Sequence, residues 1–327
     1  MKKLYFTWAG LGDSLVLLGA AYNYFKKTNE RLTIGCDWKD LALKSPYVDF
    51  VDWFSFRQLY SRGVNFMLEE ARQKGFSPMF ITDSGYKYLA PKYESNVTVW
   101  ANKHMITRYC ERIGLSGDIE IEIPLEIKTE QKSKDDLICV MVGGIQKYKA
   151  IDPKVIQFIV DNLRKDFQIV QLGATSDPLL EHVQDMRGRS IIEAYRFLKK
   201  SKFFVGGVGG LLHLARAANC RSFVLQTTAE PQSLTYYTGN KYIHPLDYCD
   251  VCAKNFRDPQ HQPCFYGYKC STSFDGKRAL DLIVSEMADW TSAIIMKQIE
   301  QAIADPANGI EDFYHSHKTL TCLSAYY

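Results

Sequence analysis

The feature that most constrains this chain is an alternation of short apolar runs with longer segments of helical period. The short runs predict buried strands and the longer segments predict helices packed beside them, so the pattern indicates an α/β protein with parallel sheets. The predicted strands are Leu4–Trp8, Leu32–Gly35, Met79–Thr82, Leu137–Val142, Ile169–Leu172, Phe203–Val205 and Ser222–Thr227. The predicted helices are Ser14–Phe25, Val64–Gln73, Met105–Ile113, Val155–Leu163, Ile191–Leu198, Leu211–Ala218 and Trp290–Ile303.

One polar stretch divides the alternation into two halves. Residues 128–136 contain no apolar side chain, and the pattern of strands and helices restarts after them. A chain of 327 residues is long enough for two domains, each with its own core. We therefore expect Rossmann-like domains at 1–130 and 131–327, facing each other across a cleft where ligands bind at the carboxyl ends of the strands.

Charge and targeting signals exclude several classes of protein. A formal net charge of +3 is too small for a dedicated nucleic-acid binder, although a local basic patch stays open. The apolar start after Lys3 imitates a signal peptide, but Asp13 and the glycine turn before it interrupt the apolar core, which favours a retained strand and helix. No other segment has the apolar length of a membrane span. We expect a cytoplasmic protein that could touch a membrane surface.

The first loop combines glycines with an acid. Ala9-Gly10-Leu11-Gly12-Asp13-Ser14 follows a predicted strand and opens a predicted helix, so its amides and the Asp13 carboxylate should point into the cleft. Asp13 could simply cap the helix, or it could accept the proton of an acceptor hydroxyl. A dinucleotide site would place a third glycine where the chain has Leu15, which disfavours an oxidoreductase.

A second glycine-rich turn predicts a phosphate site. Gly206-Gly207-Val208-Gly209-Gly210 lies between a predicted strand and a helix N-terminus, where backbone amides and the helix dipole favour a diphosphate. His213 could donate to a phosphate or be a buried structural histidine. Lys147 and Lys149 follow the strand that ends at Gly143-Gly144 and could reach the same phosphates or be solvated surface lysines.

The order of these segments resembles glycosyltransferase family 9, the bacterial lipopolysaccharide heptosyltransferases, over nearly the whole chain. Gly10-Leu11-Gly12-Asp13 is similar to the opening motif of that family, and Ser45-Pro46-Tyr47-Val48-Asp49 looks like its next recurring turn. Further matches in the second half follow the family's order and spacing: Gln171-Leu172-Gly173-Ala174 with Asp177, Arg187-Gly188, Ile191-Ile192-Glu193-Ala194, Val205-Gly206 through Gly210-Leu211, and His213-Leu214-Ala215.

The resemblance implies a GT-B fold and an inverting transfer of sugar from a nucleotide-diphosphate donor, similar to ADP-heptose, to a hydroxyl acceptor. It implies that Asp13 is the general base and that Lys149, with Lys147 as its substitute, neutralises the donor phosphates. Glu193 would lie near the donor ribose or base. The full expected donor set is Gly12, Lys147, Lys149, Gly173, Glu193, Gly209, Gly210, Leu211 and His213. No catalytic metal is expected, since a helix end and a lysine can balance the charge of the leaving group.

One position departs from the family pattern. At Val208-Gly209 these enzymes commonly carry an acid followed by Ser or Thr. Loss of that acid leaves the donor sugar open. It also supports an alternative hypothesis, a non-catalytic GT-B-fold binding or assembly protein.

Four of the nine cysteines are crowded together, at Cys249, Cys252, Cys264 and Cys270. Their spacing suits a tetrahedral site of four sulfurs, and the alternative is a set of loop thiols. The resemblance adds that autotransporter heptosyltransferases hold iron in a similar insert, with zinc as the generic alternative. A metal with four protein ligands would be structural, because no position is open to substrate.

The acceptor is less constrained. His104 and Arg108, at the start of the predicted helix Met105–Ile113, could form a basic face for an anionic acceptor, although helix-start polarity also explains them. A lipopolysaccharide core, a protein and modified DNA all stay open as acceptors. Formation of a homo-oligomer stays open as well.

Overall fold

A computed structural model of the chain describes its elements in two separate compact units. The units are residues 1–276 and 277–327. The first unit contains both sheets, and in the second the structure describes residues 277–289, which are helical. The described residues are 1–7, 10–53, 63–81, 103–129, 136–144, 149–227, 235–247, 264 and 267–289. The predicted helix Trp290–Ile303 lies outside them.

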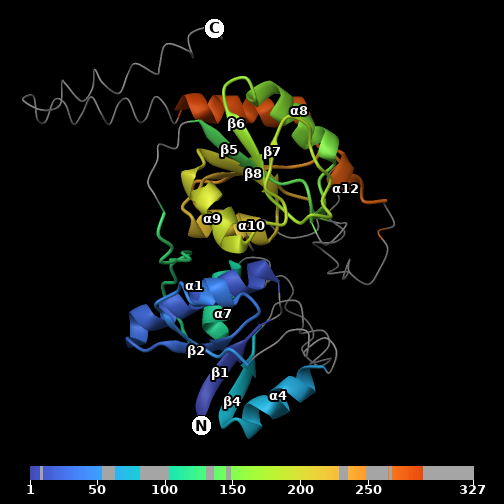
Figure 1. The fold of residues 1–327 in the computed structure, drawn as a ribbon. Helices are drawn as coiled ribbons and strands as arrows, with labels where there is room; N and C mark the ends of the chain where they lie inside the picture. The colour runs from blue at the N-terminus through green and yellow to red at the C-terminus, as the bar shows by residue number, and fades with distance from the viewer. Residues whose placement is uncertain are drawn as a thin grey trace, which may run out of the picture. The chain divides into compact units, whose positions relative to one another are not determined.

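The first sheet has four parallel strands in the order β3-β2-β1-β4, of which β1 and β4 lie side by side in Figure 1. Its strands are β1 (Lys2–Phe6), β2 (Leu32–Gly35), β3 (Val48–Phe50) and β4 (Phe76–Phe80). The chain moves outward in one direction from β1 to β3 and then returns to the other side of β1. The switch point of this sheet therefore lies between β1 and β4, and ligands of open parallel sheets bind beyond the carboxyl ends of such strands.

The helices of this half surround one long helix. They are α1 (Leu11–Thr28), α2 (Lys39–Ala42), α4 (Val64–Gln73) and α7 (Met105–Arg112). Helix α1 packs against β2 and α7 and buries a run of small and apolar residues in its first three turns. It ends at Asn29 in the left-handed conformation, with Lys26 and Lys27 in its last turn, where positive charge is favourable.

The second sheet has six parallel strands in the order β10-β9-β8-β5-β6-β7. They are β5 (Leu137–Val140), β6 (Gln168–Gln171), β7 (Gln184–Asp185), β8 (Phe203–Gly207), β9 (Ser222–Leu225) and β10 (Lys241–Ile243). Counted within the sheet, this is the order 3-2-1-4-5-6 of nucleotide-binding Rossmann folds. Its switch point lies between β5 and β8, where Gly143-Gly144 and the glycine-rich turn follow the two strands.

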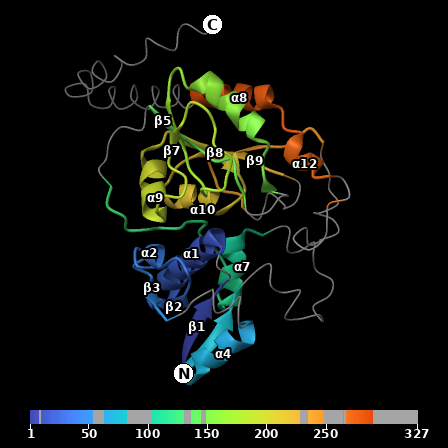
Figure 2. The same cartoon turned by 45° about the vertical axis from the view of Figure 1, so that its right-hand side comes forward.

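Local sequence signals account for the helices of this half. The helices are α8 (Pro153–Leu163), α9 (Ile191–Lys200), α10 (Gly210–Ala217) and α12 (Lys269–Thr272). Of these, α9 and α10 lie side by side (Figure 2). Asp152 caps α8 by accepting from the Lys154 amide, and Pro153 occupies the first helical position, where its missing N–H costs nothing.

The predicted pattern of strands and helices is largely confirmed. β2 and α4 have the predicted bounds, and the other predicted elements in the described residues differ by a few residues at their ends. The first strand was placed two residues too late, since β1 is Lys2–Phe6 and Trp8 lies outside the described residues. Three strands were missed, namely β3, β7 and β10, which are too short to show an alternating pattern.

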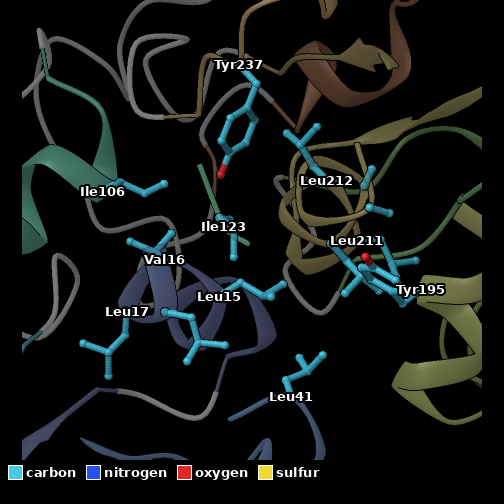
Figure 3. Close-up of a cluster of buried hydrophobic side chains, with 14 of the residues drawn as sticks. Leu15, Val16, Leu17, Leu41, Ile106, Ile123, Tyr195, Leu211, Leu212 and Tyr237 are labelled. Carbon is cyan, nitrogen blue, oxygen red and sulfur yellow. The ribbon is translucent and has the colours of Figure 1, made fainter. Parts of the chain in front are cut away.

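A single cluster of buried apolar side chains extends over both sheets. It includes Leu15 and Leu17 of α1, Ile106 of α7, Tyr195 of α9 and Leu211 of α10 (Figure 3). Burial of apolar area is the main stabilising term in folding, so this cluster ties the two halves of the first unit together. The domain boundary at 130/131 stays a prediction.

Candidate functional site

The first loop places Asp13 in the first turn of α1. Gly10 precedes the helix and its carbonyl accepts from the Ser14 amide at 3.0 Å. The helix begins at Leu11, so Asp13 is its third residue and the prediction that Asp13 could be the capping residue is wrong. The carboxylate folds back over Gly10, and its Oδ2 occupies the space that a side chain there would need. A side chain at position 10 would therefore displace the Asp13 carboxylate from this place.

Two buried hydroxyls support the Asp13 carboxylate. The hydroxyl of Tyr109, on α7, donates to Asp13 Oδ1 at 3.1 Å. Tyr109 Oη lies 3.1 Å from Oγ1 of Thr7, the residue that follows β1. Both Tyr109 and Thr7 are almost completely buried. The sequence analysis missed Tyr109 because 96 residues separate it from Asp13.

The second glycine-rich turn has the predicted position between strand and helix. β8 ends at Gly207, Val208 is buried, and Gly209 is fully extended before α10 begins at Gly210. Among the described residues, a Cβ on Gly209 would meet only Met141 Cε, at 3.8 Å, so these residues leave space around the Gly209 backbone. The N-terminus of α10 thus presents backbone amides and the positive end of a helix dipole at the switch point of the sheet.

The N-termini of α1 and α10 are in contact. A Cβ on Gly12 would lie 2.9 Å from His213 Cδ2 and 3.7 Å from Gly210 Cα. A Cβ on Gly210 would lie 2.7 Å from Leu11 Cβ. The structure therefore brings together the acid-bearing turn of the first half and the glycine-rich turn of the second. It also explains why positions 12 and 210 are glycines, since a side chain at either one would overlap the facing helix, which the sequence did not reveal.

His213 is buried and neutral at this contact. Burial, with the nearby positive charge of Lys149 as a second cause, lowers its pKa to about 3. Its Nδ1 is hydrogen-bonded to the hydroxyl of Tyr237, whose ring packs edge-on at 5.7 Å between centroids. Burial raises the pKa of Tyr237 well above its ordinary value. Of the expected donor set, His213 and Lys149 thus lie close together, whereas Lys147 lies outside the described residues.

His104 and Arg108, the predicted acceptor residues, are both buried, at 8% and 7% exposure. His104 caps α7, because its Nδ1 accepts from the Ile106 amide at 3.1 Å. Burial lowers the pKa of His104 to about 3 as well, and the positive charge of Arg216 adds to that effect. A role for either residue in acceptor binding stays a prediction.

Arg216 of α10 connects the second half to the segment that follows α7. Its Nε donates to the Ile121 carbonyl at 3.2 Å, and its guanidinium forms an ion pair with Glu122. A further donor reaches the Thr238 carbonyl at 3.4 Å, and the guanidinium lies over the Tyr237 ring at 5.7 Å. Arg216 was not singled out from the sequence, where a lone arginine on a helix carries no signal.

Gly173 lies beyond the carboxyl end of β6 in a conformation that favours glycine, with φ of 144°. The carboxylate of Asp177 lies next to Gly173. Its Oδ2 accepts from the Ala174 amide at 2.8 Å, and the carboxylate fills the space beside Gly173 and Gly143. This carboxylate therefore lies at the strand ends β5 and β6, close to the switch point.

Glu193, the expected ribose or base contact, forms a capping box with Ser190. Its Oε2 accepts from the Ser190 amide at 3.1 Å and from the Ser190 hydroxyl at 2.7 Å. These hydrogen bonds lower the pKa of Glu193. The Ser-x-x-Glu spacing could have predicted this cap.

Two of the four clustered cysteines are described. Cys264 is partly exposed and Cys270 is buried, and both are free thiols. Cys249 and Cys252 lie outside the described residues. The described part of the chain contains no group of three or more His, Cys, Asp or Glu able to hold a metal. None of its helices is both long and apolar enough to cross a bilayer.

Known structures show where this fold occurs. No protein-family model and no curated protein matches the chain. The iron-containing dodecameric glycosyltransferase TibC from enterotoxigenic E. coli is 12% identical, with a TM-score of 0.65 over 89% of this chain and 77% of its own. A family 9 glycosyl transferase from Veillonella parvula is 13% identical, with a TM-score of 0.60 over 86% and 95% of the two chains.

The ADP-heptose lipopolysaccharide heptosyltransferase II of E. coli is also similar, at 13% identity and a TM-score of 0.57 over 76% of this chain and 92% of its own. The chain therefore has the α/β fold of GT-B glycosyltransferases, and its resemblance to family 9 heptosyltransferases is confirmed at the level of the fold.

Proposed function

We propose that this chain is an inverting glycosyltransferase that moves a sugar from a nucleotide-diphosphate donor to a hydroxyl acceptor. The observation that carries the proposal is the contact between the turns that hold Asp13 and Gly209-Gly210, each at the switch point of its own parallel sheet. A base and a diphosphate-binding helix end side by side are the two groups that a displacement at an anomeric carbon needs.

In the proposed reaction, the acceptor oxygen attacks the anomeric carbon as the bond from that carbon to the diphosphate oxygen breaks. Asp13 takes the proton of the acceptor hydroxyl. The N-terminus of α10 and the ammonium of Lys149 stabilise the negative charge that develops on the leaving diphosphate. His213, being neutral, can donate one hydrogen bond without adding charge, and Gly12, Gly173 and Leu211 complete the proposed donor surface.

The donor is proposed to be similar to ADP-heptose, because TibC has been solved with ADP-D-beta-D-heptose. The acceptor could be a lipopolysaccharide core, a protein or modified DNA, with His104 and Arg108 in the acceptor half. We place the protein in the cytoplasm, with peripheral membrane contact and homo-oligomer formation as open properties.

The four cysteines are proposed to hold a structural iron or zinc. Cys264 and Cys270, the described pair, are both free thiols, as ligands of such a metal would have to be. The Gly267 amide donates to the Cys264 carbonyl at 3.1 Å, and Gly267 and Tyr268 are left-handed before α12 begins. The metal would link loop to core and supply no catalytic chemistry.

The test begins with nucleotide binding. Titration with ADP, UDP, GDP, CDP and TDP, followed by mass spectrometry of a panel of nucleotide sugars, should identify one donor that binds and is hydrolysed. Asp13→Asn should keep nucleotide affinity and lose turnover by about a hundredfold or more. Asp49→Asn is the matched control, because Asp49 is a partly exposed acid that pairs with Lys2 at 2.7 Å. Full turnover in Asp13→Asn would refute the base assignment.

A second candidate, a non-catalytic binding or assembly protein, is favoured by Val208. This side chain is 7% exposed and belongs to the apolar core, where family members commonly carry an acid. A protein that binds none of the nucleoside diphosphates would support this candidate. The oxidoreductase hypothesis loses support, because Leu15 at the third-glycine position is fully buried in the core.

A further inference from the structure

A chain of three hydroxyl and carboxylate groups runs through the core below the proposed base. Thr7 Oγ1, Tyr109 Oη and Asp13 Oδ1 are linked by two hydrogen bonds of 3.1 Å each. Thr7 is 1% exposed and Tyr109 is fully buried. The three residues come from the end of β1, from α7 and from the first turn of α1.

The direction of the hydrogen bonds follows from the chemistry of the groups. A phenol has one hydrogen, and an ionised carboxylate can only accept. When Asp13 is ionised, the Tyr109 hydrogen is therefore used toward Asp13 Oδ1. Thr7 Oγ1 must then donate to Tyr109 Oη, which fixes the rotation of the phenol O–H toward the carboxylate.

We propose that Tyr109, oriented by Thr7, is the positioning residue of the Asp13 base. Its hydroxyl holds the carboxylate in one orientation and stabilises the ionised form that can accept a proton. A hydrogen bond donated to a carboxylate favours its charged state, and the hydroxyl that donates this one is buried, which strengthens its effect. The role of Asp13 as a base rests on the proposed function, but the stabilisation of its charge does not.

Two other groups near this end of α1 have different contacts in the described part of the chain. His213 of α10 approaches Gly12, but its Nδ1 is committed to Tyr237 and its pKa is lowered to about 3, so it is uncharged. The charge of Lys149 reaches His213. Tyr109 is the titratable group that α7 brings into hydrogen-bond contact with Asp13.

The first experiment needs no substrate. The side-chain carboxyl carbon of Asp13 is titrated by NMR in the full chain, with its resonance assigned by its loss in Asp13→Asn. We expect Tyr109→Phe to raise the pKa of Asp13 by about one pH unit and Thr7→Val to raise it by less. If Tyr109→Phe does not fold, Thr7→Val carries the test alone. Equal midpoints in wild type and variants would overturn the proposal.

Tyr22→Phe is the matched control. It removes a tyrosine hydroxyl that donates to a carboxylate, that of Glu120, at 2.7 Å, but on the exposed side of α1. In Tyr22→Phe, the midpoint of the Asp13 titration should equal that of the wild type. A midpoint raised as much as in Tyr109→Phe would show a general effect of losing any phenol on the core, and would overturn the specific role of Tyr109.

The second experiment uses the donor that gives turnover. We expect Tyr109→Phe to lower kcat about tenfold, to leave KM for the donor unchanged, and to move the acidic limb of the pH profile upward. If the pH profile of Tyr109→Phe equals that of the wild type while Asp13→Asn is inactive, the role of Tyr109 is refuted and the proposed base is kept. An active Asp13→Asn would refute the proposed base, while the NMR midpoints would still decide whether Tyr109 stabilises its charge.

Discussion

Gly210 lies against Leu11: a Cβ on this glycine would approach the Leu11 Cβ to 2.7 Å and its Cγ to 2.8 Å. The first residue of α10 and the first residue of α1 thus pack so closely that a methyl group on Gly210 would require Leu11 to shift. Together with Gly12 and His213, they form the contact on which the candidate site depends.

The glycines at the contact should differ in their tolerance of a methyl group. Gly210→Ala and Gly12→Ala should each destabilise the fold by about 1–2 kcal/mol, because the new Cβ overlaps Leu11 or His213 and this cost exceeds the gain in helix propensity. Gly209→Ala should change stability by less than about 0.5 kcal/mol, since its Cβ meets, within the part of the chain that the structure describes, only Met141 at 3.8 Å. Urea denaturation measures all three. If the three variants lose the same free energy of unfolding, the cost does not come from the close packing of Gly12 and Gly210.

Acid should destabilise the fold through the two buried histidines. Burial lowers the pKa of His104 and His213 to about 3, from an ordinary 6.5. Between these values the unfolded chain binds protons that the folded chain does not, so the free energy of unfolding falls as pH falls. Each histidine should contribute about 1.4 kcal/mol per pH unit in the middle of this window, and nothing above pH 7.5 or so.

The variant His104→Asn isolates one of these contributions. Asparagine is a good N-cap and does not titrate, so the cap of α7 is kept while one titrating group is lost. Denaturation between pH 4 and pH 8 should show a slope smaller than that of the wild type by about 1.4 kcal/mol per pH unit near pH 5. A slope unchanged from wild type would mean that His104 is already protonated in the folded chain.

Arg216 should stabilise the first unit more than its ion pair alone would. Its guanidinium reaches two carbonyls, the Glu122 carboxylate and the face of Tyr237. Arg216→Lys should cost about 1–2 kcal/mol, because a single ammonium cannot keep all four contacts. Glu122→Gln should cost less than about 1 kcal/mol, since that carboxylate is 47% exposed. Thermal melting of both variants tests the difference, and a larger loss in Glu122→Gln would reverse our interpretation.

Metal content should depend on the clustered cysteines. Protein purified without chelator should contain about one iron or zinc per chain, and Cys270→Ser or Cys249→Ser should lose most of it. Elemental analysis by mass spectrometry measures both. Cys36→Ala is the control: Cys36 is buried, and burial raises the pKa of its thiol to about 12, so it stays protonated and is a poor ligand. Metal-free wild-type protein would contradict the site.

The sequence predicted most of this fold because its signals are local. The period of apolar residues located the strands and helices, and glycines located the turns at Gly10 and Gly209-Gly210. An exposed two-residue strand such as β7 leaves no such pattern. The same limit applies to the site: Asp13, Lys149 and His213 stand in or next to recognisable turns, whereas Tyr109 and Arg216 lie inside ordinary amphipathic helices.

Local signals in the sequence were thus enough to predict the longer strands and helices, the glycine turns and the acid in the first turn of α1, since hydrogen-bond geometry and apolar period act between near neighbours in the chain. Only the tertiary structure decided which distant residues meet: Tyr109 with Asp13 across 96 positions, and His213 with Gly12. It also decided that His104 is buried and neutral. These pairings depend on how the sheets and helices pack, which no local pattern records, because burial and contact are properties of the folded chain as a whole.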